Sequence, residues 1–175
     1  MKVATELDSI TSLIDCCGST TDLCIDSLTR ILASLELGED WLAEHLPNPL
    51  PESGYHRTLL HQAKCFEIVL ATWPVGGGTL VHDHGSLNSQ GVVKVLQGNL
   101  FNQIYALQED GTVRPGERLI AETGSTVPVT HDLIHAMGHG GGHQGVAASL
   151  HVYFPWIVEV RYWDPKTGLP VENNL

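Results

Sequence analysis

The chain has 175 residues, of which 42% are hydrophobic and 17% charged, and its formal net charge at pH 7 is -11. This length and composition predict one globular unit with its own hydrophobic core and argue against a disordered chain. The acidic balance argues against nucleic acid or a membrane as a partner, so an anionic substrate would need a local cation at its binding site.

The first part of the chain is predicted to be helical. Residues 5–36 carry apolar side chains at helical spacing in two runs, which are separated by a polar stretch at residues 18–21. Residues 39–46 indicate a third, shorter helix, and three prolines at positions 47, 49 and 51 end it. We therefore expect residues 1–50 to form a helical segment packed on a β-domain of residues 51–175.

The four cysteines indicate a reducing environment. Cys16, Cys17 and Cys24 crowd one short stretch without CxxC spacing or a nearby histidine, and Cys65 stands apart. We interpret the first three as buried thiols of a helix pair rather than as disulfides or metal ligands. The N-terminal residues do not resemble a signal peptide and no apolar stretch is long enough to span a membrane, so a cytoplasmic location is expected.

From about Tyr55 the pattern changes to short β-strands divided by turns. Runs rich in Val, Ile, Leu and Phe alternate with Gly, Pro, Asn and Asp clusters, which favours a mainly β fold of the jelly-roll or sandwich type. A segment rich in glycine and histidine, residues 138–145, is predicted to be a flexible loop. The expected strands are residues 66–73, 92–96, 99–105, 117–121, 125–129, 147–154 and 158–162.

The histidines give the strongest chemical signal, because His82 and His84 flank Asp83 in a predicted strand. Residues two apart in a strand face the same side, so the two imidazoles can point at one metal ion. A third histidine from the second half of the chain would complete a facial set with open positions for other ligands. Without that partner, the pair is simply a polar strand end. The candidates for the third ligand are His131, His135, His139, His143 and His151.

The surroundings of this pair resemble the first motif of the cupin superfamily. Gly76 lies six residues before His82, and the following strand closes at Leu96-Gln97-Gly98. Cupins usually place a glutamate ligand where this chain has Gly91, so the resemblance implies a site made of histidines alone. The second motif matches best around His135, which the resemblance makes the third ligand. We expect His139 and His143 to be solvent-exposed or part of a lid.

Four segments in order resemble the cysteine dioxygenase family of thiol dioxygenases. They are residues 55–57 with Tyr55 and Arg57, the segment from His82 to Leu100, residues 133–135, and Ser149-Leu150-His151-Val152-Tyr153. The resemblance implies a cupin jelly-roll with an N-terminal helical segment, a monomer or weak dimer, and Fe(II), although Ni(II) or another divalent ion suits three histidines as well. It also implies that L-cysteine is oxidised with O2 to cysteine sulfinate.

The resemblance also implies roles for residues beside the metal. The planar guanidinium of Arg57 would bind a substrate carboxylate through two hydrogen bonds. Tyr55 would support either Arg57 or Tyr153 by a hydrogen bond. Ser149, His151 and Tyr153 alternate along one strand and so face one side, where serine can orient histidine and histidine can orient the phenol.

Two departures from the family keep alternatives open. Animal members have a cysteine at the position of Gly91, and this cysteine is crosslinked to the tyrosine that corresponds to Tyr153. Here no thioether can form, as in many bacterial members. The segment at residues 85–90 looks longer than usual and borders the site. A specialised relative is therefore one alternative, acting on another small thiol or oxidising cysteine further in a biosynthetic pathway. A non-catalytic cupin that binds a metal or small ligand is the other.

Overall fold

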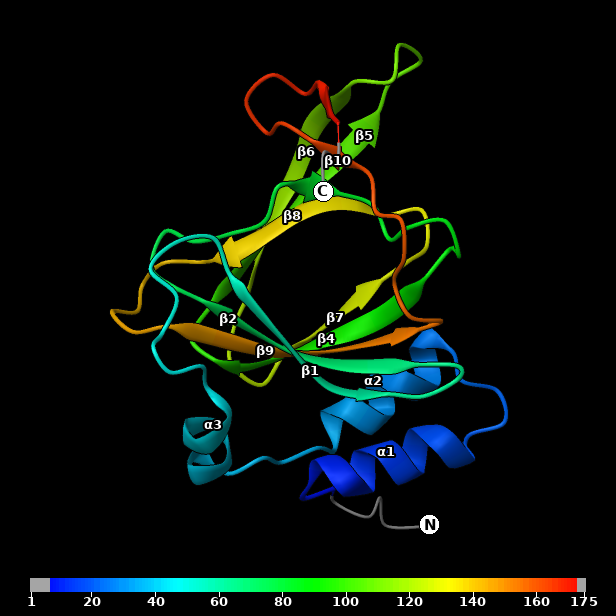
Figure 1. The fold of residues 1–175 in the computed structure, drawn as a ribbon, viewed down its shortest axis with the longest axis vertical. Helices are drawn as coiled ribbons and strands as arrows, with labels where there is room; N and C mark the ends of the chain where they lie inside the picture. Colours follow the sequence, from blue (N-terminus) through cyan, green and yellow to red (C-terminus); the bar gives the residue numbers. More distant parts are fainter. Residues whose placement is uncertain (1–6, 173–175) are drawn as a thin grey trace.

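Two antiparallel sheets face each other, and helices cover the outer face of one of them (Figure 1). The computed structural model describes residues 7–172. The five-stranded sheet has the order β1-β2-β9-β4-β7, and the six-stranded sheet has the order β11-β10-β3-β8-β5-β6. Strand β9 lies between β2 and β4, so a late segment of the chain pairs with two early ones.

The helices are α1 (Ile10–Ser19), α2 (Ile25–Ala33) and α3 (Glu39–His45). The strands are β1 (His56–Gln62), β2 (Glu67–Trp73), β3 (Val81–His82), β4 (Gln90–Gln97), β5 (Leu100–Leu107), β6 (Val113–Ala121), β7 (Thr126–Val129), β8 (Ile134–His139), β9 (Ala147–Phe154), β10 (Tyr162–Trp163) and β11 (Pro170–Val171).

Both faces of the central strands β2, β4 and β9 are buried, because helices lie outside and the second sheet lies across the interior. Even-numbered residues such as Ile68 and Val152 pack outward in a cluster with the helices. Odd-numbered residues such as Ala71 and Val93 pack inward in a separate cluster. Strands buried on both sides read as continuous apolar runs. Any polar side chain at an inward position of β2 or β9 therefore faces the interior.

The apolar faces of α1 and α2 pack against the outer side of the five-stranded sheet. Leu13 and Leu28 are fully buried there. Lys94 of β4 points the same way, and its Nζ donates to the backbone oxygens of Leu32 and Leu35 at the end of α2. A lysine near the last carbonyls of a helix adds a donor where few backbone N–H groups remain, although Leu32 O also accepts from Leu35 N.

The mainly β, cupin-like fold and the three helices are confirmed, although residues 5 and 6 of the first expected helix lie outside the described part of the chain. The strand expected at residues 158–162 is wrong for residues 158–161, and of that range only Tyr162 lies in a strand, β10. Residues 157–161 are irregular, because Val158 O accepts from Ser86 N and Arg161 O accepts from Asp83 N instead of pairing in a ladder. Strand β1 was not among the expected strands. It is an edge strand with mostly exposed or half-buried residues, so its sequence is too polar to be recognised as a strand.

Of the three N-terminal cysteines, only one is fully buried as expected. Cys17 is buried between the helices, whereas Cys24 is exposed and its side chain caps the first turn of α2 by accepting from Ser27 N. No helix within residues 7–172 is long and apolar enough to cross a membrane.

Candidate metal centre and adjoining pocket

Three histidines from the six-stranded sheet converge at the interior. His82 ends β3, His84 follows it, and His135 of β8 pairs directly with His82 in the ladder. One ring nitrogen from each lies within 4.8 Å of the other two. The two histidines of the His-X-His motif converge although β3 ends at His82, and of the five candidates for the third position the structure brings His135 to them.

Each of these imidazoles has an oxygen acceptor on Nδ1, which fixes its tautomer. The partners are Leu80 O for His82 at 2.9 Å, Leu133 O for His84 at 3.1 Å, and Asn102 Oδ1 for His135 at 2.8 Å. With the proton on Nδ1, the lone pair on Nε2 points into the site. The Nε2 atoms of His84 and His135 are buried and have no hydrogen-bond partner within residues 7–172. Buried polar atoms are almost always paired, so two orphaned nitrogens side by side fit a metal ion.

The three rings are held in the neutral form that a metal requires. Burial lowers the pKa of His84 to about 4, with the neighbouring His82 adding to the effect. Burial likewise lowers the pKa of His82, and that of His135 falls well below its usual value. Three neutral nitrogen donors suit Fe(II), Ni(II) and other divalent ions of the first transition row.

Asp83, between two of the histidines, faces the other way and organises the turn. Its Oδ1 accepts from the backbone N–H groups of Gly85 and Arg161, and its Oδ2 accepts from Arg161 Nε. These contacts hold the pKa of Asp83 below its usual value although burial alone would raise it. The carboxylate thus ties the ligand turn to the segment that borders the site.

A chain of hydrogen bonds runs along the inner face of β2 and β9. Trp73 Nε1 lies 2.9 Å from Ser149 Oγ, which lies 2.8 Å from His151 Nε2, and His151 Nδ1 lies 2.8 Å from the Tyr153 hydroxyl. An indole N–H can only donate. When Ser149 accepts from Trp73 and donates to His151, the imidazole carries its proton on Nδ1 and donates to Tyr153. This tautomer, assigned from the hydrogen-bond partners, leaves the phenol proton of Tyr153 free for a ligand.

Burial keeps the end of this chain uncharged at neutral pH. It is the main cause that lowers the pKa of His151 to about 3, and the nearby positive charge of Arg57 adds to it. Burial also raises the pKa of Tyr153. The phenol therefore keeps the proton that it can donate.

Arg57 and Glu67 form an ion pair in the wall of the pocket. Arg57 Nη2 lies 2.8 Å from Glu67 Oε1, and the same oxygen accepts from Ile157 N at 3.3 Å. Arg57 pairs with Ala71 in the ladder between β1 and β2, which places its side chain on the inner face. The guanidinium side chain is 41% exposed, whereas that of Glu67 is 4% exposed, so the arginine stands nearer the opening.

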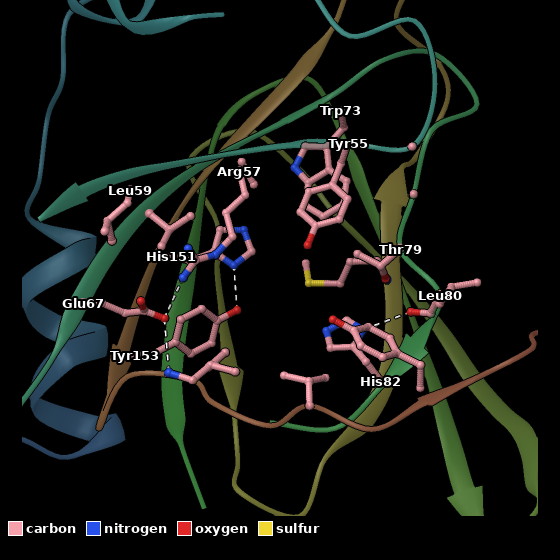
Figure 2. Close-up of a pocket in the computed structure, with 18 of the residues that line it drawn as sticks. Tyr55, Arg57, Leu59, Glu67, Trp73, Thr79, Leu80, His82, His151 and Tyr153 are labelled. Atoms are coloured by element: carbon pink, nitrogen blue, oxygen red, sulfur yellow. Dashed lines mark hydrogen bonds and ion pairs between the residues drawn. The ribbon is translucent and has the colours of Figure 1, made fainter. Parts of the chain in front are cut away.

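One pocket joins the metal-site edge, the hydrogen-bond chain and the ion pair. Its volume is about 790 Å³, and Figure 2 shows Arg57, Glu67, His151 and Tyr153 on one wall with His82 across the cavity. Apolar residues of the irregular segment at 156–160 line its rim. A concave site with a few convergent polar groups is the usual form of a small-molecule site.

Gly91 lies against Tyr153, because the ladder between β4 and β9 pairs these two residues. A Cβ atom at this position would come within 2.1 Å of Val152 O and 2.8 Å of Tyr153 Cδ1. Any side chain here, including a cysteine, would force the backbone or the ring to move.

The chain also matches a described protein family. The profile of the family called Cysteine dioxygenase type I matches residues 39–166, which is well over half of the chain. The chain belongs to the cysteine dioxygenase family. Human cysteine dioxygenase type 1 is 30% identical to this family member over 118 residues, covering 65% of the chain and 58% of the human protein. The protein of the same name from Pongo abelii matches to the same extent. The match thus spans less than two thirds of the length of either relative.

Solved structures share the fold of this cysteine dioxygenase family member at low identity. Oxalate oxidase in complex with the substrate analogue glycolate aligns with a TM-score of 0.52 and 17% identity, covering 68% of this chain and 60% of that one. An uncharacterized protein with a double-stranded β-helix domain from Klebsiella pneumoniae aligns with a TM-score of 0.50 and 12% identity, covering 89% of this chain and all (100%) of that one. These similarities concern the fold alone.

Two expectations for the surrounding residues are wrong. His139 is buried at the end of β8, where its Nε2 lies 2.9 Å from Gly145 O, rather than solvent-exposed. His143 is exposed, as expected, and stacks on His139. Tyr55 stacks on Trp73 with ring centroids 4.9 Å apart, and its hydroxyl makes none of the hydrogen bonds found within residues 7–172. It therefore lies beside Arg57 and Tyr153 without the expected bond to either.

The sequence did not predict that Trp73, Asn102 and Glu67 belong to the site. Asn102 and Glu67 are polar residues inside predicted apolar strands, which is a signal that they face something other than a plain core. Trp73 gave no such signal, because a tryptophan in a strand normally serves as core. Its partner Ser149 lies 76 residues away in the chain.

Proposed function

We propose that this chain is a metal-dependent thiol dioxygenase that oxidises L-cysteine with O2 to cysteine sulfinate, with Fe(II) as its metal. The observation that carries the proposal is the group formed by His82, His84 and His135. Their rings have oxygen partners on Nδ1, and two of the buried Nε2 atoms have no partner in the part of the chain that the structure describes. Membership of the cysteine dioxygenase family supports the same chemistry.

The three histidines would hold the metal through Nε2. A bound divalent metal would lower the pKa of the substrate thiol, so that the reactive thiolate forms at neutral pH. Both oxygen atoms of O2 would end on the substrate sulfur. Neutral ligands suit this task, because they leave the positive charge of the metal available for the thiolate.

The residues of the opposite wall would position the substrate. Arg57 would hold the substrate carboxylate with the N–H groups that Glu67 does not use. Tyr153 would donate a hydrogen bond from its free phenol O–H to the substrate, with His151 and Ser149 fixing the direction of that O–H. Tyr55 would close the pocket beside Arg57 by contact. The apolar rim would exclude water.

The cellular location, the oligomeric state and the partners of the enzyme are predicted as follows. Cys16, Cys17, Cys24 and Cys65 are free thiols, which is compatible with the cytoplasm. A monomer or weak dimer is the expected state, and size-exclusion chromatography with light scattering at several concentrations tests it. Nucleic acid and membranes are not expected partners of so acidic a chain.

The deciding experiment is anaerobic reconstitution with iron, followed by addition of L-cysteine and O2. We expect oxygen consumption and, by mass spectrometry, a product that carries two added oxygens on intact cysteine. His135→Ala should lose both metal and activity. His143→Ala is the matched control, because His143 is exposed in the glycine-rich loop, and it should retain both.

Other outcomes point to the alternatives. Loss of carbon dioxide or further oxidation of the product would indicate a specialised relative. Reaction only with another thiol or only with Ni(II) would replace the substrate or metal proposed here. Metal binding without oxygen consumption for any thiol would favour a non-catalytic cupin.

A further inference from the structure

Glu67 is a buried carboxylate in the pocket that the proposed reaction does not use. It begins β2, pairs with Tyr153 in the ladder to β9, and is only 3% exposed. Burying a carboxylate is costly unless it is paired and hydrogen-bonded. Glu67 meets this requirement through Arg57 Nη2 and Ile157 N. It is therefore a built part of the pocket wall rather than a stray surface charge.

The pair determines the charge of the pocket. Among the described residues that line the cavity, Arg57 is the only lysine or arginine and Glu67 the only carboxylic acid. The other titratable groups of the lining are histidines and tyrosines, and burial favours the neutral form of His151 and Tyr153. Apart from the metal, one positive and one negative charge thus cancel each other in the wall.

Arg57 still has room for a substrate carboxylate. A guanidinium has five N–H donors, and within residues 7–172 only the Nη2 group is engaged, with Glu67. A carboxylate bound to the remaining donors would share Arg57 with Glu67. A second carboxylate on the same ligand would meet the charge of Glu67 without any further lysine or arginine in the wall.

Size does not make this selection. A volume of about 790 Å³ lies in the range of pockets that enclose drug-sized ligands, and a thiol with two carboxylates remains far smaller than that. Discrimination between small thiols must therefore come from charge and hydrogen bonding, and often from an element that repels the wrong ligand.

We infer that Glu67 is a specificity-determining residue, which limits the pocket to thiols with a single carboxylate and rejects thiols with two. The inference rests on the proposed function, because it takes the ligand to be a small thiol held between the metal and Arg57. The role of Glu67 is exerted on binding, so it can be measured without turnover.

The test uses full-length protein loaded with Co(II) under anaerobic conditions. Thiolate binding to Co(II) is followed by the charge-transfer absorption during titration with 3-mercaptopropionate and with mercaptosuccinate, which add one and two carboxylates to the thiol. The wild type should bind the monocarboxylate more tightly. In Glu67→Gln the amide oxygen can still accept from Arg57 and Ile157, but the charge is gone. The ratio of the two dissociation constants should fall by about tenfold or more, as expected for removal of a like charge at short range.

Glu117→Gln is the control. Glu117 is exposed on β6 outside the pocket, so the substitution changes the net charge equally and should leave the ratio unchanged. An equal change in both variants would mean that the field of the whole molecule, not Glu67, sets the preference.

The inference is overturned if the folded Glu67→Gln protein keeps the wild-type ratio. It is equally overturned if the wild type binds mercaptosuccinate as tightly as 3-mercaptopropionate, a result that needs no variant to fold. A shifted ratio in a protein that consumes no oxygen would support Glu67 and refute the dioxygenase. Failure of the Co(II) protein to bind any thiol would refute both.

Discussion

At the scale of single residues, the site is defined by which ring nitrogen carries a proton. Asn102 Oδ1 and the backbone oxygens of Leu80 and Leu133 each accept from an Nδ1 of the three-histidine group. Groups of this kind orient metal ligands and raise their basicity. Of the three acceptors, only Asn102 is a side chain, so it alone can be removed by substitution.

We predict that Asn102→Ala weakens metal binding by about 10- to 100-fold, the usual cost of removing such a partner. Competition titration against a chromophoric chelator with Co(II) or Ni(II) measures the affinity. Gln103→Ala is the matched control, because the Gln103 amide donates to backbone oxygens on the other side of β5. Equal affinities in Asn102→Ala and the wild type would contradict the assigned role.

A second prediction concerns the direction of the hydrogen-bond chain. In Trp73→Phe the indole donor to Ser149 is lost, so His151 no longer needs to carry its proton on Nδ1. We expect kcat to fall by about tenfold, on the scale of one net hydrogen bond. Nitrogen chemical shifts of His151 should show a mixture of tautomers.

Trp163→Phe is the control for this experiment. The Trp163 indole donates to Gly111 O, away from the metal site, so kcat and the His151 shifts should stay at wild-type values. An unchanged His151 tautomer in Trp73→Phe would show that something other than the indole sets the direction of these hydrogen bonds.

At the scale of elements, the helices and the five-stranded sheet are joined by a polar contact as well as by apolar packing. Lys94 is 6% exposed on the outer face of β4, and its pKa is lowered by burial. Its Nζ donates to two backbone oxygens at the end of α2. The inward neighbours Val93 and Val95 face the interior instead. The same strand thus serves the helical layer and the pocket on alternate residues.

Lys94→Met should therefore destabilise the fold without affecting the metal site. Leu32 O would still accept from Leu35 N, but Leu35 O would lose its donor Lys94. Leaving a buried carbonyl oxygen without a donor costs about 1–3 kcal/mol. Urea unfolding measures the loss, and metal content should remain at the wild-type level. Lys64→Met, at an exposed position, should change neither quantity. A Lys94→Met protein as stable as the wild type would mean that water or other donors reach these oxygens.

At the scale of the whole molecule, buried neutral histidines make the stability of the metal-free protein depend on pH. The pKa of His151 is about 3 and that of His84 about 4 in the folded chain, with burial as the main cause. In the unfolded chain a histidine binds a proton near pH 6.5. Between these values the unfolded state binds more protons, so stability rises with pH and falls on acidification.

We predict that the metal-free protein loses stability between pH 7.5 and pH 5.5. The slope below pH 6.5 should be on the order of 1 kcal/mol per pH unit for each such histidine. Urea unfolding at both pH values measures it. His151→Gln removes one contributor and should reduce the slope. Equal stability of the wild type at the two pH values would contradict burial of neutral rings.

The sequence by itself determined the features that depend on local spacing. Helical periodicity in residues 5–36, strand alternation at Ser149, His151 and Tyr153, and the His-X-His pair each follow from neighbours within a few positions. The cysteine dioxygenase resemblance identified the family that the profile match confirms. It also picked out His135, which joins His82 and His84 in the structure.

Only the tertiary structure decided which distant side chains meet. The neighbours of a strand depend on sheet order, and β9 comes to lie between β2 and β4 although long stretches of chain separate them. That order places Trp73 on Ser149. The register of β1 on β2 and a bulge near Leu59 bring Arg57 to Glu67. Composition predicts a strand at residues 158–162, but residues 157–161 are irregular, because backbone groups of this segment bond to the turn that carries His84 instead of to a ladder. Pairing across sheets is set by packing of the entire core, which no local pattern records.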